Sequence, residues 1–182
     1  GKPVAFISID NIHGNNLYDL ESLPDEGMQE LDSLFSGLAK HYRDAYYERA
    51  DFFWDIHAGQ IVYGRKQNED TNHLYLVDVD PHVESLTPYH LKKNLSVEEL
   101  DNFVIALENL QAAITYCEEK FKNSNPLQDA RDALREVILE LRKEIPADAG
   151  LKEMEERWSG SPIKSGMTGK KDSFVIQSIK TQ

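Results

Sequence analysis

Apolar residues recur every three or four positions over three long stretches of the chain, which is the spacing of one helical face. In the first stretch, from Met28 to about Glu48, the repeating residues are Met28, Leu31, Leu34, Phe35, Leu38, Tyr42, Ala45 and Tyr46. The second stretch ends near Phe121 and the third before Pro146. The pattern therefore predicts three long helices, each with one buried face.

Polar residues and prolines predict where the last two helices begin. Ser96 is a typical N-cap, and Glu99 follows it at the spacing of a capping box. Asn125 is followed by Pro126, and proline is favoured at the first helical position. We therefore expect helices that begin after Ser96 and after Asn125, and Pro146 ends the second of them.

Shorter apolar runs predict strands. Val4–Ile9 is typical of a buried strand, and we expect it to pass into a turn at His13–Asn16. Two further runs, Gln60–Tyr63 and His73–Val79, are separated by the polar stretch Arg65–Asn72, which predicts a hairpin. The expected fold class is α+β, mainly helical with one short β-hairpin.

The helical pattern gives way to glycine, serine and lysine near residue 150. We therefore expect one folded body over residues 1–148 and a polar, partly flexible tail over residues 149–182.

Composition narrows the classes of function. The chain has 182 residues, 40% of them apolar, and a net charge of −12. An acidic protein without a basic cluster repels the phosphate backbone, so nucleic acid is not an expected partner. No apolar run is long enough to cross a membrane and no signal sequence is visible. The single Cys117 excludes an internal disulfide and favours a cytoplasmic or other reducing compartment.

The predicted hairpin carries the candidate chemistry. Asp55 stands in the loop before its first strand, Asp78 ends its second strand, and the carboxamide of Gln60 lies between them in the sequence. A hairpin brings these loops together, and carboxylate and amide oxygens are ligands that Mg²⁺ accepts alongside phosphate oxygens. The pattern predicts a magnesium site that handles a nucleotide phosphate.

The motif Asp-x-His-x-Gly-Gln-Ile-Val, a short hairpin and then Leu-Tyr-Leu-Val-Asp-x-Asp resemble the catalytic and metal-binding loops of the protein-kinase-like fold. The resemblance is closest to its aminoglycoside-phosphotransferase and bacterial small-kinase branches and covers roughly residues 4 to 82. It implies a phosphotransferase that uses ATP and Mg²⁺. Asp55 matches the catalytic aspartate, and Gln60 and Asp78 match the metal ligands.

Other residues follow from the same resemblance. Residues 6–12 resemble the strand and hinge that hold adenine, which implies cofactor contacts at Ile9, Asp10 and Ile12. His57 matches a residue that braces the catalytic loop, and Asp80 is a supporting acidic residue near the metal.

The chain departs from the family pattern at several positions. Gln60 replaces the usual Asn, Phe53-Trp54 replace His-Arg or His-Gly, and Asp80 stands where protein kinases have Gly. No glycine-rich phosphate loop and no Val-Ala-x-Lys strand precede Val4. The resemblance therefore implies only the helical lobe, starting at the hinge. The resemblance leaves three alternatives for the amino-terminal lobe: it was removed, it is supplied by another chain, or the protein does not need it.

These departures and the negative charge keep a second hypothesis open, a noncatalytic acidic module that binds a protein through its helical half. Asp10 and Asp55 also resemble the metal carboxylates of a nucleotide-cyclase palm, although Trp54 stands where that site needs Gly. Finally, the aromatic residues between 42 and 54 could form a base-stacking surface, but their helical spacing favours the core.

Overall fold

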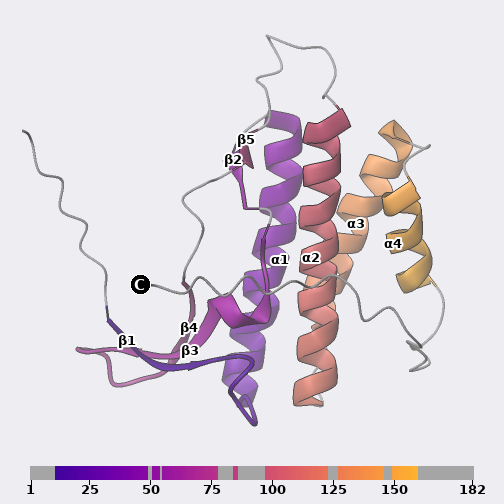
Figure 1. The fold of residues 1–182 in the computed structure, drawn as a ribbon. Coiled ribbons are helices and arrows are strands. Elements are labelled where there is room, and N and C mark those ends of the chain that lie inside the picture. Colours follow the sequence, from indigo (N-terminus) through magenta and orange to yellow (C-terminus); the bar gives the residue numbers. More distant parts are fainter. Residues whose placement is uncertain are drawn as a thin grey trace, which may run out of the picture.

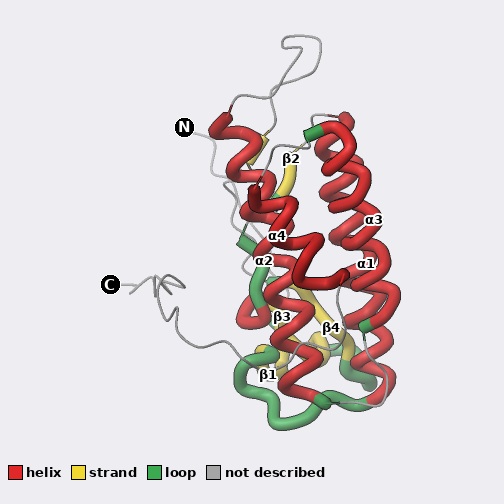
Figure 2. The backbone as a smooth tube through the Cα atoms, turned by 90° about the vertical axis from the view of Figure 1, so that its right-hand side faces the viewer, coloured by secondary structure: helices red, strands yellow, loops and turns green. Residues whose placement is uncertain are grey.

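The computed structural model describes residues 11–48, 51–53, 55–77, 84–85, 97–122, 127–145 and 149–159. Over these ranges the chain forms four α-helices and two small antiparallel sheets, so the α+β, mainly helical class is confirmed. The helices are α1 (Asp25–Glu48), α2 (Val97–Phe121), α3 (Gln128–Glu144) and α4 (Ala149–Ser159). Figures 1 and 2 show the helices packed side by side, with the larger sheet beside one end of α1.

The first three helices enclose the core. Their inward faces bury large side chains completely, among them Phe35, Tyr42, Phe103, Leu107, Ile114 and Leu134. Helices α1 and α3 run in the same direction, because Asp32 contacts the start of α3 while Tyr47 contacts Glu144 at its end. Helix α2 runs the opposite way beside them (Figure 1). The three helical stretches predicted from periodicity are thus confirmed.

Helix α4 occupies the first part of the predicted tail. Its Leu151 and Met154 are fully buried in the same core, and the Gln111 side chain of α2 donates to the Met154 carbonyl at 3.3 Å. The folded part of the chain therefore includes residues 149–159. Residues 160–182 lie outside the described part.

Strands β1 (Ile12–Asn16), β3 (Ile61–Lys66) and β4 (His73–Leu76) form a sheet in the order β1-β3-β4. The hairpin predicted from the sequence is the antiparallel pair β3–β4, in which Ile61 faces Leu76. A second, two-stranded sheet joins β2 (Asp51–Phe52) to β5 (Glu84–Ser85).

The predicted turn at His13–Asn16 is wrong, since these residues form β1. Gly14 faces Gly64 across the β1–β3 pair, and a Cβ on Gly14 would lie 2.4 Å from the Tyr63 carbonyl oxygen. Gly14 thus allows β1 and β3 to approach closely and does not form a turn. The turn follows the strand, where Asn16 Oδ1 accepts the Tyr18 and Asp19 amides at 2.9 and 3.1 Å. The expected strand Val4–Ile9 lies outside the described residues.

The helix starts agree in part with prediction. Helix α2 begins directly after Ser96, as expected, although Ser96 itself lies outside the described residues. Helix α3 begins at Gln128, and its N-cap Leu127 makes no side-chain cap, so the predicted cap at Asn125 is wrong. The start of α3 is instead capped by α1, because Asp32 accepts the Ala130 amide at 2.8 Å.

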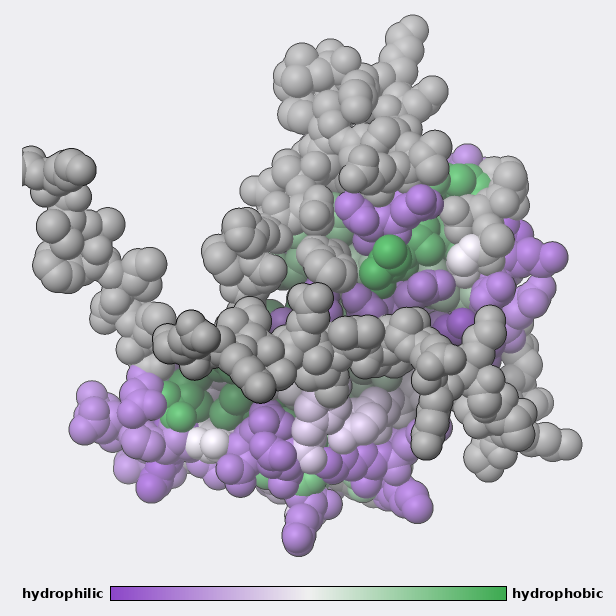
Figure 3. All heavy atoms as spheres, in the orientation of Figure 1, coloured by the Kyte–Doolittle hydropathy of each residue, from purple (hydrophilic) through white to green (hydrophobic). Residues whose placement is uncertain are grey.

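Most of the described surface is polar. Figure 3 shows one face on which hydrophilic residues predominate and hydrophobic ones form small areas. Among the described residues, the large hydrophobic side chains that remain exposed are Tyr18, Tyr47 and Ile105. None of the described helices is both long and apolar enough to cross a membrane.

Candidate functional site

The loop between β2 and β3 presents Asp55 to solvent. Asp55 is exposed, whereas its neighbour Ile56 and the nearby Ala58 are 2% and 1% exposed and fix the loop to the core. The carboxylate therefore lies on the outer side of a loop whose apolar residues point inward.

The loop closes into the 3₁₀ helix η1 (Ala58–Gln60), which two polar side chains hold in shape. His57 caps this helix, and its Nδ1 accepts the Gly59 amide at 3.1 Å. Gln60 returns the contact, since its Oε1 accepts the His57 amide at 3.3 Å. The Gln60 side chain is 8% exposed, so its amide oxygen serves the loop itself.

Backbone pairing joins this loop to the strand ends that border residues 78–83. On one side, the Val77 amide donates to the Gln60 carbonyl at 2.8 Å. On the other side, Phe52 pairs with Glu84 in the β2–β5 sheet. The loop that carries Asp55 is therefore tied at both ends to the chain that flanks Asp78 and Asp80. Those two residues, with Ile9, Asp10 and Trp54, lie outside the described part.

Ile12, predicted to contact adenine, is the first residue of β1 and is half-buried. It faces Lys66, at the end of β3 farther from η1. The strand from Ile61 to Lys66 spans about 17 Å at ~3.4 Å per residue. Ile12 thus shares a sheet with the loop of Asp55 but lies a strand length away from it.

The aromatic residues behind the loop belong mainly to the core. Tyr42, Tyr46 and Phe52 are at most 6% exposed, which confirms the core prediction for them, while Tyr47 is 39% exposed. The Tyr42 hydroxyl donates to the Phe53 carbonyl at 2.5 Å and so connects the start of the loop to α1. Burial raises the pKa of Tyr42, and the negative charge of Asp55 raises it further.

A group of residues that the sequence did not single out flanks η1. The ring of Tyr18 lies parallel to that of His57, with centroids 6.0 Å apart, and meets Tyr116 edge-on at 5.1 Å. Lys120 Nζ donates to the Tyr18 carbonyl at 2.5 Å and to the Tyr116 hydroxyl at 3.3 Å. Burial raises the pKa of Tyr18, with smaller contributions from Tyr116, Cys117 and Asp55.

The sequence held only a weak signal for this group. Tyr116 and Lys120 stand four residues apart on α2, the spacing of side chains that can touch on a helix. Tyr18 is 102 residues from Lys120, and no local pattern links such distant positions.

Among the described residues, no three or more His, Cys, Asp or Glu side chains gather so that they could hold a metal ion. Comparisons with protein-family models, curated proteins and solved structures found no match to this chain.

Proposed function

We propose that the chain is the helical part of an ATP-dependent phosphotransferase with the protein-kinase-like pattern that its sequence resembles. The observation that carries the proposal is the hydrogen bond from the Val77 amide to the Gln60 carbonyl. It joins the end of β4, directly before Asp78, to the loop in which Asp55 is exposed. A shared nucleotide and metal would require the loops of Asp55 and Asp78 to converge, and this bond supports that part of the proposal.

In the proposed reaction Asp55 orients the acceptor hydroxyl and takes its proton as the hydroxyl oxygen attacks the terminal phosphorus of ATP. The bond from this phosphorus to the bridging oxygen breaks, and ADP leaves. Its exposed carboxylate leaves room for an acceptor. His57 and the buried Ile56 hold the loop in place while the proton moves.

The donors fit Mg²⁺ in kind, because Asp78 and Gln60 supply carboxylate and amide oxygens. Gln60 Oε1 already accepts the His57 amide, so its share in binding the metal depends on its second lone pair. When bound, Mg²⁺ would neutralise charge on the phosphate oxygens.

The test is an isothermal titration of the intact chain with Mg-ATP, followed by measurement of phosphate release, in which water takes the place of the acceptor hydroxyl. We expect Asp78→Ala to abolish the binding heat. Asp55→Ala should keep most of the heat and lower phosphate release on the order of a thousandfold, the loss typical of removing one group that acts in the transition state.

Asp70→Ala is the matched control, because Asp70 is an exposed carboxylate in the turn of the same hairpin. It should leave both heat and release unchanged. Binding heats that stay the same after Asp78→Ala would contradict the proposal.

A second candidate is a noncatalytic acidic module that binds a basic protein. It is favoured by Gln60, whose carboxamide is buried and engaged in capping η1, and by the net charge of −12. A stoichiometric basic partner whose affinity is unaffected by Asp55→Ala and Asp78→Ala would support this candidate over the first.

A further inference from the structure

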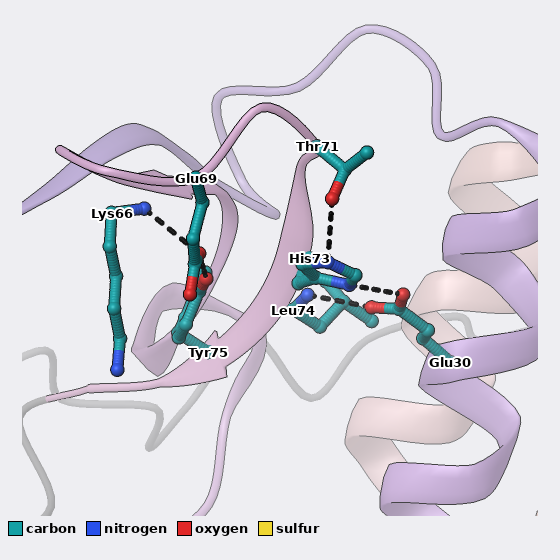
Figure 4. Close-up of polar contacts among 7 residues, drawn as sticks. All are labelled: Glu30, Lys66, Glu69, Thr71, His73, Leu74 and Tyr75. Atoms are coloured by element: carbon teal, nitrogen blue, oxygen red, sulfur yellow. Dashed lines mark hydrogen bonds and ion pairs between the residues drawn. The ribbon is translucent and has the colours of Figure 1, made fainter.

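Thr71, His73 and Glu30 form a hydrogen-bonded series at the turn end of the β3–β4 hairpin (Figure 4). The loop of Asp55 lies at the other end of the hairpin, where the Val77 amide donates to the Gln60 carbonyl. Thr71 Oγ1 lies 2.9 Å from His73 Nε2, and His73 Nδ1 lies 2.8 Å from Glu30 Oε1. A hydroxyl, an imidazole and a carboxylate are thus connected in the order that activates an oxygen nucleophile.

The directions of these hydrogen bonds follow from the chemistry of the groups. A carboxylate only accepts, so His73 Nδ1 carries the proton that is donated to Glu30. In the neutral ring Nε2 then has a lone pair, and the Thr71 hydroxyl donates to it. His73 is therefore oriented as a general base toward Thr71.

Further hydrogen bonds hold Glu30 and the turn that carries Thr71 in place. Glu30 Oε2 accepts the Leu74 amide at 2.8 Å, which fixes the carboxylate of α1 to β4. In the same turn Glu69 accepts the Lys66 amide at 3.2 Å and the Tyr75 hydroxyl. The hydrogen bonds of Glu69 therefore stabilise the turn that carries Thr71.

Charge and exposure indicate what can react there. The His73 and Glu30 side chains are 48% and 36% exposed, and Thr71 is exposed, so a reagent from solution can reach the hydroxyl. Glu30 contacts His73, and Glu69 lies in the same turn as Thr71. Two carboxylates disfavour an anionic phosphoryl donor and favour a neutral carbonyl group.

The geometry points to Thr71 as an acylation site, with His73 as general base and Glu30 as positioning residue, that takes an acyl group from an activated ester or thioester. Thr71 Oγ1 bonds to the carbonyl carbon while its proton passes to His73 Nε2. The tetrahedral intermediate then breaks its bond to the leaving oxygen or sulfur, and the proton goes to the leaving group or to water. Hydrolysis of acyl-Thr71 releases the carboxylic acid and restores the hydroxyl.

The experiment treats the full chain with p-nitrophenyl acetate, follows p-nitrophenolate release, and locates acetyl groups by peptide mass mapping. We expect one acetyl group on the peptide that contains Thr71. Thr71→Val should lower release at least about tenfold, because it removes the hydroxyl whose attack the general base would accelerate by ~10²–10⁴. Thr71→Ser should retain the acetylation.

Two further comparisons separate chemistry from structure. Thr115→Val is the matched control, because the Thr115 hydroxyl donates to the Gln111 carbonyl and has no imidazole partner; release should not change. Glu30→Gln should lower release and Glu30→Asp should restore part of it. Release unchanged by Thr71→Val, or acetyl groups found only on lysines or on His73, would overturn the assignment.

Discussion

Several polar side chains connect segments of this protein by accepting hydrogen bonds from backbone amides. Asp32, Glu30, Glu69 and Gln60 each accept a backbone amide, and the first two reach across from α1 to other elements. A buried or half-buried amide without an acceptor destabilises the fold, so each of these side chains replaces a missing backbone partner. Part of the acidic composition is therefore structural.

Asp32 provides a test at the residue scale. Its two carboxylate oxygens accept the Asp129 and Ala130 amides at 3.3 and 2.8 Å and cap a helix whose own N-cap residue cannot do so. Asp32→Ala should lower the free energy of unfolding by about 1–2 kcal/mol, the usual cost of losing a side-chain cap. Urea unfolding followed by circular dichroism measures the change.

Asp132→Ala serves as its control, because Asp132 is exposed on the same α3 helix. A surface change of this kind should stay within about 0.5 kcal/mol. Equal effects of the two substitutions would show that the cap has no energetic weight.

At the scale of elements, the β1–β3 pair depends on two facing glycines. A Cβ on Gly64 would lie 2.5 Å from the His13 carbonyl oxygen and 2.6 Å from the Gly14 Cα, so a larger residue forces the strands apart. The same pair positions the chain that leads to Tyr18, since the Leu17 amide donates to the Ile61 carbonyl at 2.9 Å. The glycines thus help to place the residues around η1.

Gly64→Ala should therefore destabilise the protein by about 1–3 kcal/mol, as overpacking does elsewhere. Gly37→Ala is the matched substitution of opposite sign, because a Cβ at this exposed position of α1 meets nothing within 4 Å. It should stabilise the helix by roughly 0.5–1 kcal/mol. Thermal unfolding of both variants measures these changes. A Gly64→Ala protein as stable as the original would contradict the claim that β1 and β3 need the close approach.

At the scale of the whole molecule, the helical core encloses a titratable thiol. Cys117 is fully buried, and burial raises the pKa of its thiol to about 12 from an ordinary 9.0. Glu118 raises this pKa further and Lys120 opposes the shift. The native protein therefore retains a proton that the unfolded chain loses at a lower pH.

The free energy of unfolding should therefore decrease as the pH rises. Below the unfolded pKa of about 9 both states hold the proton and the fold keeps its full stability; above it the unfolded chain binds fewer protons, so the free energy of unfolding decreases by up to ~1.4 kcal/mol per pH unit. Urea midpoints between about pH 8 and 9.5 measure the slope before the tyrosines, whose ordinary pKa is about 10, are half ionised. Cys117→Ala should flatten it, and an identical slope in the variant would contradict the explanation.

Local patterns predicted those elements whose cause is local. Helical periodicity located α1, α2 and α3, and β-branched and aromatic runs located the β3–β4 hairpin, because each depends on which face of a short segment is apolar. The same reasoning failed at the start of α3 and at residues 13–16. At the first, the cap comes from Asp32 in another helix, and at the second a glycine serves a strand partner, not a turn.

The sequence by itself determined the fold class, three of the four described helices, and the position of Asp55 in a loop before a hairpin, because these depend on neighbouring residues. Only the tertiary structure decided that Val77 binds to Gln60, that Tyr18 meets Lys120, and that Thr71, His73 and Glu30 connect. Such contacts unite residues from separate elements, and packing of the helices against the sheet selects them among many that the sequence alone allows.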